Sequence, residues 1–262
     1  RPWSVFRPSN LVPLVVLGVL FAAAITATAQ PARDAYTRGE FRAAEKQWRE
    51  ALAAQPTNWS AHHNLALALA QQQRWAEAAA HALTAFVQQP SQESVRWHFE
   101  YTLGRAGYSP PVLGEFTAPD LRHRLAWLFS PSEWQRVLLA AVALAVMAGL
   151  LMLMQAYGPR RRGLTLIAAL AGVLAFVLAA AAAVSLPRYG PARDPRGVLV
   201  WKAVPLRSLP TDVATEQQTT NLAAGSLAIV DQSFLGWRRL VFPNGQTGWV
   251  RKEDFVPLWA VN

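Results

Sequence analysis

Cysteine is absent from the 262-residue sequence, and its absence excludes several classes of protein. A chain without thiols has no disulfide framework, no thiolate nucleophile and no cysteine-ligated zinc site. Charged residues are also few, at 16%, and the 16 acidic residues are outnumbered by 25 lysines and arginines. The composition therefore makes the apolar segments, and the places where positive charge collects, the informative features.

Catalytic motifs are lacking as well. The sequence has no glycine-rich phosphate loop, no Gly-x-Ser-x-Gly and no His-Glu-x-x-His. His62 and His63 are adjacent, so they point to different sides of a helix, and the other histidines have no histidine or carboxylate three or four residues further along. These are His81, His98 and His123. We therefore expect a protein that is not an enzyme, with no metal site and no cofactor.

The formal charge of +9 is unevenly distributed. Residues 30–133 contain ten basic and ten acidic residues, and residues 197–262 contain six and five. Most of the surplus flanks apolar runs, at Arg1, Arg7, Arg136, Arg160, Arg161, Arg162, Arg188, Arg193 and Arg196. Positive charge beside apolar spans is typical of membrane topology, whereas a nucleic-acid-binding protein has a basic stripe or patch. We expect a membrane protein and no nucleic-acid partner.

Two apolar runs between residues 134 and 187 organise the chain. They extend from Val137 to Met154 and from Leu164 to Leu186, contain no charged residue, and are joined by a turn at 158–163. Each has the roughly 17 to 25 residues that a helix needs to cross a bilayer. A transmembrane helical hairpin is predicted. The alternative is a buried hairpin in a soluble protein, although core helices of this length usually have a polar face.

Aromatic and basic residues suggest how this hairpin is placed. Trp134, Tyr157 and Tyr189 flank the spans, where amphipathic rings favour the headgroup level. The three arginines at 160–162 favour a cytoplasmic turn by the positive-inside rule. The regions before and after the hairpin then lie together on the outer side, although four of the flanking arginines are placed there too.

The first 29 residues resemble an export signal. Arg1 and Arg7 precede an apolar run from Leu11 to Ala29, which ends in Ala27-Thr28-Ala29 before Gln30. The alternative is an uncleaved N-terminal anchor, because the apolar run is long enough to span. Either form sends residue 30 and the following region across the membrane.

Residues 30–109 contain an internal repeat. Gly39, Phe41, Ala44, Ala51 and Pro56 recur 34 residues later as Gln73, Trp75, Ala78, Ala85 and Pro90. The alanines let paired helices approach closely, and the prolines end the second helix of each unit. A period of 34 residues is that of tetratricopeptide repeats. A third unit has only its first helix, at 93–105, which is suited to capping the array.

This region resembles the tetratricopeptide repeat family. The resemblance implies a concave groove lined by the first helix of each unit, which holds an extended peptide or a helix of a protein partner. The 34-residue register places Tyr36, His63, Asn64, Trp97, Tyr101 and Arg105 in that groove. Aromatic residues and arginine are frequent hot spots of interfaces. The alternative is that Trp97 and Tyr101 pack on the helix beneath.

Residues 110–133 are predicted to form a linker with a short amphipathic segment. Leu121, Leu125, Leu128 and Phe129 recur at helical spacing beside Arg122 and Arg124. Next to a membrane span, such a segment either lies in the membrane interface or docks on the repeat helices.

A connector at 188–197, rich in proline and glycine, leads into a β region at 198–262. Strands are predicted at 198–203, 226–231, 236–242 and 247–251, with a hairpin turn at Phe242-Pro243-Asn244-Gly245. Short strands over about 65 residues indicate a small all-β barrel.

The β region resembles the bacterial SH3 family. The resemblance is strongest at Gly236-Trp237-Arg238-Arg239-Leu240 and Asn244-Gly245-Gln246-Thr247-Gly248-Trp249-Val250. Trp237 and Trp249 are expected in the core and at the rim of the closing hairpin. Members of this family often bind cell-wall peptides, which makes peptidoglycan a candidate ligand.

The order of signal, tetratricopeptide units, membrane hairpin and bacterial SH3 barrel is similar to that of the BatE-like proteins of bacterial aerotolerance operons. This resemblance implies von Willebrand A-type membrane proteins and a MoxR-type ATPase as partners. The expected function is an inner-membrane scaffold that presents two interaction modules on the periplasmic side. The alternative function is a cell-wall-binding sensor or anchor that uses the SH3-like domain.

Overall fold

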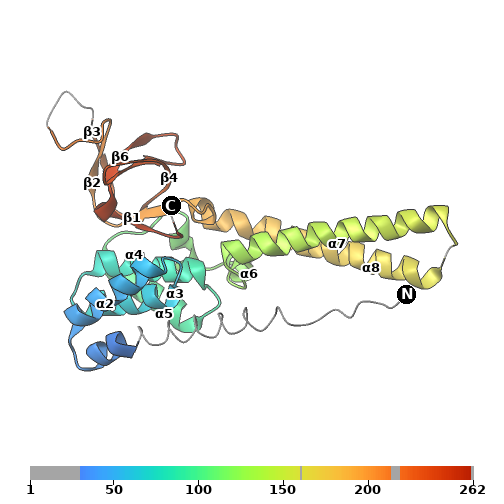
Figure 1. The fold of residues 1–262 in the computed structure, drawn as a ribbon, viewed down its shortest axis with the longest axis horizontal. Helices are drawn as coiled ribbons and strands as arrows, with labels where there is room; N and C mark the ends of the chain where they lie inside the picture. Colours follow the sequence, from blue (N-terminus) through green and yellow to red (C-terminus); the bar gives the residue numbers. More distant parts are fainter. Residues whose placement is uncertain (1–29, 160, 214–218, 261–262) are drawn as a thin grey trace, which may run out of the picture.

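The structure is a computed structural model that describes residues 30–159, 161–213 and 219–260. A bundle of short helices lies at one end of a long two-helix hairpin, and a small β-sheet lies beside the bundle at that same end (Figure 1). The predicted signal or anchor, at 1–29, falls outside the described residues. The predicted fold class, which combines helical repeats, an apolar helical hairpin and a small all-β unit, is confirmed.

The repeat region begins with a helical segment at 30–37 and continues with four helices. These are α2 (Phe41–Ala54), α3 (Trp59–Gln71), α4 (Trp75–Gln88) and α5 (Glu93–Ala106). The turns before α2 and α4 are equivalent, because Gly39 (φ +79°) and Gln73 (φ +58°) both adopt left-handed backbone conformations. Ala44 and Ala78 are completely buried, as close helix packing requires. The 34-residue sequence period is therefore also a structural period.

Two short helices connect the repeats to the hairpin. They are η1 (Leu113–Thr117) and α6 (Leu121–Ala126), and α6 begins at Asp120, whose side chain accepts a hydrogen bond from the backbone N–H of His123. The hairpin helix α7 (Pro131–Tyr157) then starts at a capping box formed by Ser130 and Glu133.

The apolar hairpin consists of α7 and α8 (Arg162–Ser185). Both helices are long and apolar enough to cross a membrane. The buried positions recur every seven residues, at Ala141, Ala148 and Gln155 on α7 and at Ala168, Ala175 and Ala182 on α8. A seven-residue spacing is typical of a left-handed antiparallel pair, and alanine allows close approach. At the far end, the Oε1 atom of Gln155 accepts a hydrogen bond of 2.9 Å from the hydroxyl of Thr165.

The end of the hairpin next to the repeats, which we call the root, differs from the sequence prediction. Trp134 and Tyr189 do not face lipid at the headgroup level, because they are only 2% and 0% exposed. The indole N–H of Trp134 and the hydroxyl of Tyr189 both donate to the backbone oxygen of Ala126, at 3.1 and 3.0 Å. That prediction is wrong for these two residues, since their polar atoms are satisfied by α6. Tyr157, at the far end, is exposed.

The C-terminal β module is a seven-stranded antiparallel sheet in the order β3-β2-β6-β5-β4-β1-β7. Its strands are β1 (Gly197–Val200), β2 (Val204–Arg207), β3 (Thr219–Leu222), β4 (Ser226–Phe234), β5 (Trp237–Val241), β6 (Thr247–Arg251) and β7 (Phe255–Pro257). All four predicted strands are present, and β2, β3 and β7 are additional. The predicted turn joins β5 to β6, with Gly245 at φ +81°.

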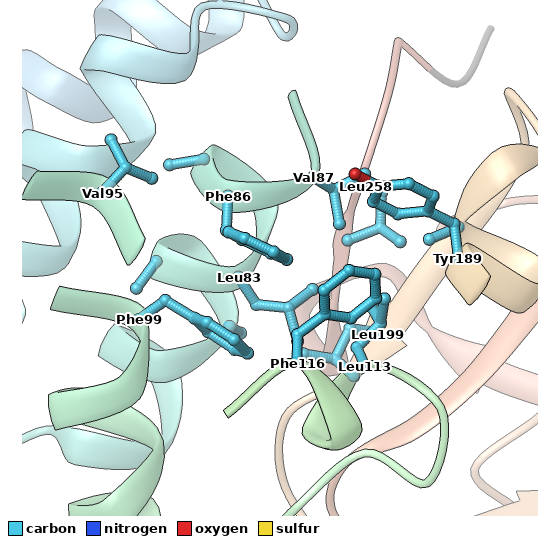
Figure 2. Close-up of a cluster of buried hydrophobic side chains, with 14 of the residues drawn as sticks. Leu83, Phe86, Val87, Val95, Phe99, Leu113, Phe116, Tyr189, Leu199 and Leu258 are labelled. Atoms are coloured by element: carbon cyan, nitrogen blue, oxygen red, sulfur yellow. The ribbon is translucent and has the colours of Figure 1, made fainter. Parts of the chain in front are cut away.

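One hydrophobic core joins the repeats, the root and the β module. Phe86 of α4 stacks on Phe99 of α5 at 4.8 Å and meets the edge of Phe116 of η1 at 5.2 Å. Leu199 and Leu258 of the β module lie in the same cluster, beside Tyr189 (Figure 2). In addition, the side-chain amide of Gln88 donates to the backbone oxygen of Leu258 at 2.9 Å. The segments at 110–133 and 188–197 are thus packed parts of the head, which we define as the described residues outside α7 and α8.

Candidate protein-binding site

The strongest candidate surface in the repeat region lies along α5. The rings of Trp97 and Tyr101 are stacked with centroids 5.4 Å apart, and the guanidinium of Arg105 lies over Tyr101 at 5.4 Å. These residues are spaced by four, so they share one helix face. Trp97 is 63% exposed and Tyr101 is 41% exposed, which is unusual for such large apolar side chains.

Trp75, at the start of α4, completes this array. Its ring meets the edge of Tyr101 at 5.9 Å and lies under Arg105 at 5.5 Å. Tyr101 is therefore supported from below, as the packing interpretation requires, whereas Trp97 contacts Tyr101 and otherwise faces solvent. The sequence placed Trp75 at a repeat turn but gave no sign that it would join Tyr101 and Arg105, because this contact crosses between units. We call Trp75, Trp97, Tyr101 and Arg105 the aromatic array.

Among the described residues, the other predicted groove residues make their ring contacts and hydrogen bonds outside this array. The ring of His63 meets the edge of the buried His98 at 5.1 Å. Tyr36 packs on Phe41 at 5.4 Å and accepts a long hydrogen bond of 3.4 Å from Gln71. Asn64, on α3, is half-buried. The aromatic array is therefore the concentrated part of the predicted surface.

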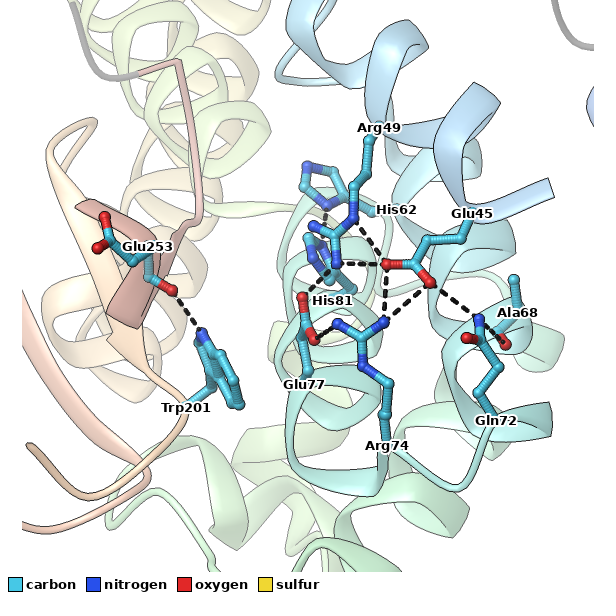
Figure 3. Close-up of polar contacts among 10 residues, drawn as sticks. All are labelled: Glu45, Arg49, His62, Ala68, Gln72, Arg74, Glu77, His81, Trp201 and Glu253. Carbon is cyan, nitrogen blue, oxygen red and sulfur yellow. Dashed lines mark hydrogen bonds and ion pairs between the residues drawn. The ribbon is translucent and has the colours of Figure 1, made fainter. Parts of the chain in front are cut away.

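A network of charges braces α2 against α3 and α4, and the local sequence did not reveal it. Arg49 and Arg74 each contact both Glu45 and Glu77, and Gln72 donates to Glu45 at 2.9 Å (Figure 3). Burial acts to raise the pKa of Glu45, but the hydrogen bonds from Gln72, Arg49 and Arg74 together lower it below its usual value. Local spacing shows only the pairs Glu45–Arg49 and Arg74–Glu77, because the other partners are about 30 residues apart.

Two histidines are buried directly behind this network. The Nδ1 atoms of His62 and His81 are 2.9 Å apart, and the other ring nitrogen of His62 is 2.9 Å from the backbone oxygen of Pro56. Burial lowers the pKa of His62 to about 4 and also lowers that of His81. On α5, burial and the neighbouring His63 lower the pKa of His98 to about 4. These histidines are therefore neutral packing residues at physiological pH.

His123 contacts two carboxylates, Asp120 and Glu115, which were not predicted from the sequence. Its Nδ1 atom is 2.8 Å from Asp120, three residues earlier, and its Nε2 atom is 3.4 Å from Glu115. Both partners precede His123 in the sequence, so the residues that follow it give no sign of them. Among the described residues, no group of three or more histidines and carboxylates is arranged to hold a metal ion.

In the β module, Trp237 and Trp249 lie on the side of β5 and β6 away from the module's own apolar cluster. Trp237 is buried, because Arg251 covers its ring at 4.2 Å and Arg207 approaches it at 5.7 Å. Trp249 is half-buried and pairs with Arg239 across the sheet. Trp237 is therefore buried by stacked arginines. It is not part of the apolar cluster that forms the core of the β module.

Comparison with known proteins identifies one part of the chain. Residues 32–93 match the family model of the tetratricopeptide repeat. Neither the curated proteins nor the solved structures gave a match. The match covers α2, α3 and α4, so the repeat architecture predicted from the 34-residue period is confirmed. Tetratricopeptide repeats are typically modules that bind other proteins and not catalytic units, and the matched segment therefore defines a protein-interaction module.

Proposed function

We propose that this protein is a non-enzymatic membrane scaffold that captures a protein partner through the groove of its repeats. The single observation on which this proposal rests is the exposed aromatic array on α5, in a head that shares one core with the root of the apolar hairpin. Large exposed aromatic rings with a stacked arginine are the usual anchors of protein interfaces. The proposed groove contains Tyr36, His63, Asn64, Trp97, Tyr101 and Arg105.

Insertion of the hairpin in a bilayer is supported by the side chains that it exposes. Leu139, Val146 and Leu150 on α7, and Leu170, Val173 and Phe176 on α8, are all more than half exposed. Soluble proteins rarely leave so continuous an apolar surface uncovered. The apolar part of α7, from Val137 to Tyr157, is about 30 Å long at about 1.5 Å per residue, which matches the hydrocarbon thickness of a bilayer.

The proposed location is the bacterial inner membrane, with the repeats and the β module in the periplasm. Arg161 and Arg162 at the far end of the hairpin favour a cytoplasmic turn. We propose that the β module is a bacterial SH3-like domain, with Trp237 and Trp249 on its closing hairpin. By its resemblance to BatE-like proteins, the protein belongs in an aerotolerance or envelope-stress complex. Von Willebrand A-type membrane proteins and a MoxR-type ATPase are then the proposed partners.

Topology is tested with single cysteines, because the natural chain has none. Glu50→Cys in the repeats and Phe234→Cys in the β module should react with a membrane-impermeant maleimide in intact spheroplasts. Pro159→Cys in the turn, which keeps every arginine there, should react only after permeabilisation. Labelling of the turn alone in intact spheroplasts contradicts the periplasmic orientation, and a protein that is soluble without detergent contradicts membrane insertion.

Partner capture is tested by replacing the exposed anchors. Trp97→Ala combined with Arg105→Ala should reduce the partner recovered from mildly solubilised membranes by a factor of ten or more, because a hot-spot residue contributes about 2 kcal/mol or more. Quantitative mass spectrometry of the co-purified proteins measures the loss. The control is Phe234→Ala, which removes a half-exposed aromatic ring from the β module. Unchanged recovery with the double variant, at unchanged helical circular dichroism, removes the groove assignment.

A cell-wall anchor is the second candidate function. Arg207, Trp249 and Arg239 form a row across β2, β6 and β5, where arginines can meet the carboxylates of peptidoglycan stem peptides. Sedimentation of the whole protein in detergent with purified sacculi distinguishes the two functions, since a pure scaffold stays in the supernatant.

A further inference from the structure

The short helix α6 lies at the root of the apolar hairpin and exposes its apolar residues. Leu121 is 82% exposed, and in the turn that follows α6, Leu128 is 56% and Phe129 is 40% exposed. The helical turn continues past Ala126, because the backbone N–H groups of Leu128 and Phe129 donate to oxygens three residues back. Outside the hairpin, few large apolar side chains in the described part of the chain are as open as Leu121.

Apolar and basic side chains of α6 and of the turn after it point in different directions around the helix axis. At about 100° per residue, Leu121, Leu125 and Leu128 project within an arc of about 60°, and Phe129 extends it on one side. Arg122 and Arg124 border this arc, one on each side, and both are exposed. An apolar strip bordered by arginines is the pattern of a helix that lies in the plane of a membrane interface.

The opposite side of α6 is fixed to the root. His123 and Ala126 are buried there, and Ala126 shares the core cluster with Trp134, Tyr189 and Ala182. The backbone oxygen of Ala126 accepts hydrogen bonds from both Trp134 and Tyr189. Trp127, in the turn after α6, contacts the repeats, where Arg96 lies over its ring at 4.8 Å. Leu125 is half-buried and packs against the shared core, whereas Leu121, Leu128 and Phe129 stay exposed.

The contact with α8 sets the depth of α6. Because α7 and α8 are antiparallel, Ala182 lies at the level of Ala141, about one helical turn inside the first apolar residue, Val137. Ala126 packs in the same cluster as Ala182, so α6 lies beside the level at which the lipid-facing surface begins. The nearby acids Asp120 and Glu115 are both close to His123, at 2.8 and 3.4 Å, and their side chains are 58% and 59% exposed.

We infer that α6 is an interfacial membrane-binding helix, which inserts Leu121, Leu128 and Phe129 among lipid chains while Arg122 and Arg124 contact the phosphates of anionic lipids. This inference rests on the proposed membrane insertion and adds a second lipid contact to it. Two contacts of different kinds, a hairpin through the bilayer and a helix along its surface, fix the angle at which the head stands on the membrane.

The test uses nitroxide labels on single cysteines in the full chain, reconstituted in vesicles of phosphatidylcholine and phosphatidylglycerol in equal amounts. Leu121→Cys and Leu128→Cys report on α6, Val142→Cys on the hydrocarbon region of α7, and Glu50→Cys on the aqueous part of the head. Collision with oxygen and with a water-soluble nickel chelate measures the depth of each label. All four positions are exposed, so labelling should leave circular dichroism unchanged.

For the labels at positions 121 and 128 we expect collision rates with the nickel chelate severalfold below the rate at position 50. Their collision rates with oxygen should lie between the rates at positions 50 and 142. If the labels at positions 121 and 128 collide with the nickel chelate as often as the label at position 50, while the label at position 142 lies in lipid, α6 is not an interfacial helix. The proposed insertion of the hairpin is unaffected by that result. Aqueous values at 142 overturn the insertion itself. Shielding of 121 from both collision reagents means that protein covers α6, which also overturns the inference.

The arginines are tested in the same vesicles. Arg122→Gln with Arg124→Gln should raise nickel collisions at 121, and so should vesicles of phosphatidylcholine alone, because each basic residue near an anionic surface adds to binding. Arg33→Gln with Arg42→Gln, which removes two exposed arginines from the repeats, is the matched control and should change nothing at 121. An unchanged depth in phosphatidylcholine vesicles overturns the contact with anionic lipids.

Discussion

Replacing Phe116 with alanine should destabilise the repeats, the root and the β module together, by about 3–5 kcal/mol. The ring of Phe116 lies 5.2 Å from Phe86 of the repeats and 5.1 Å from Tyr189 of the root, and it is 1% exposed. Truncation leaves a cavity where the parts of the head meet, and close packing prevents them from collapsing into it independently. Unfolding should therefore remain a single transition at lower denaturant concentration.

The measurement is urea unfolding of the full chain in detergent micelles, followed by circular dichroism for the helices and by the fluorescence of an environment-sensitive dye on a single cysteine, Ser233→Cys, for the β module. The control is Phe234→Ala, the same chemical change at a half-exposed position, which should alter stability by no more than about 0.5 kcal/mol. If Phe116→Ala separates the two signals into different transitions, the head is not one cooperative unit.

Acidification should weaken the repeats well before carboxylates are protonated. The pKa values of His62 and His98 are lowered to about 4 by burial, whereas in the unfolded chain they are about 6.5. Between these pKa values the unfolded chain binds protons that the folded chain does not bind. The free energy of unfolding is therefore highest above about pH 6.5 and falls as the pH drops towards about 4. At about pH 5 each histidine should remove about 2 kcal/mol from the free energy of unfolding.

Urea midpoints measured between about pH 8 and pH 5 test this expectation. The variant His62→Gln with His98→Gln should show a clearly smaller dependence on pH in this range, because its glutamines do not titrate. When the series is extended below about pH 4.5, a further loss of stability should persist in the variant, because Glu45 of the unfolded chain begins to bind a proton there while its lowered pKa keeps it ionised in the fold. An equal pH dependence in the variant and the natural chain contradicts burial of the neutral histidines.

Local pattern was sufficient for the elements whose stabilising contacts are close in sequence. The 34-residue period predicted the repeat helices, and the Pro243-Asn244-Gly245 turn predicted the β5–β6 hairpin. Strands β2, β3 and β7 have only three or four residues each, too few for an alternating pattern to appear. Their positions are set by pairing with distant strands.

Most of the errors concern residues whose partners lie on another helix or strand. Trp134 and Tyr189 have the composition of headgroup anchors, and only their hydrogen bonds to Ala126 show that they are core residues. His62 meets His81 across two helices, and Glu45 meets Arg74 at a separation of 29 residues. No local spacing predicts such pairs, because the fold alone brings them together.

The glycine at 225 illustrates how firmly the β module is joined to the repeats. A Cβ atom at Gly225 would lie 2.7 Å from the ring of Tyr108, whose hydroxyl donates to the backbone oxygen of Ala76 in α4. Together with the core that the repeats, the root and the β module share, this contact leads us to expect that the described parts of the head move as one body. With the hairpin inserted as proposed, a force applied to the repeats would then act as a torque on the hairpin, as on a stiff lever.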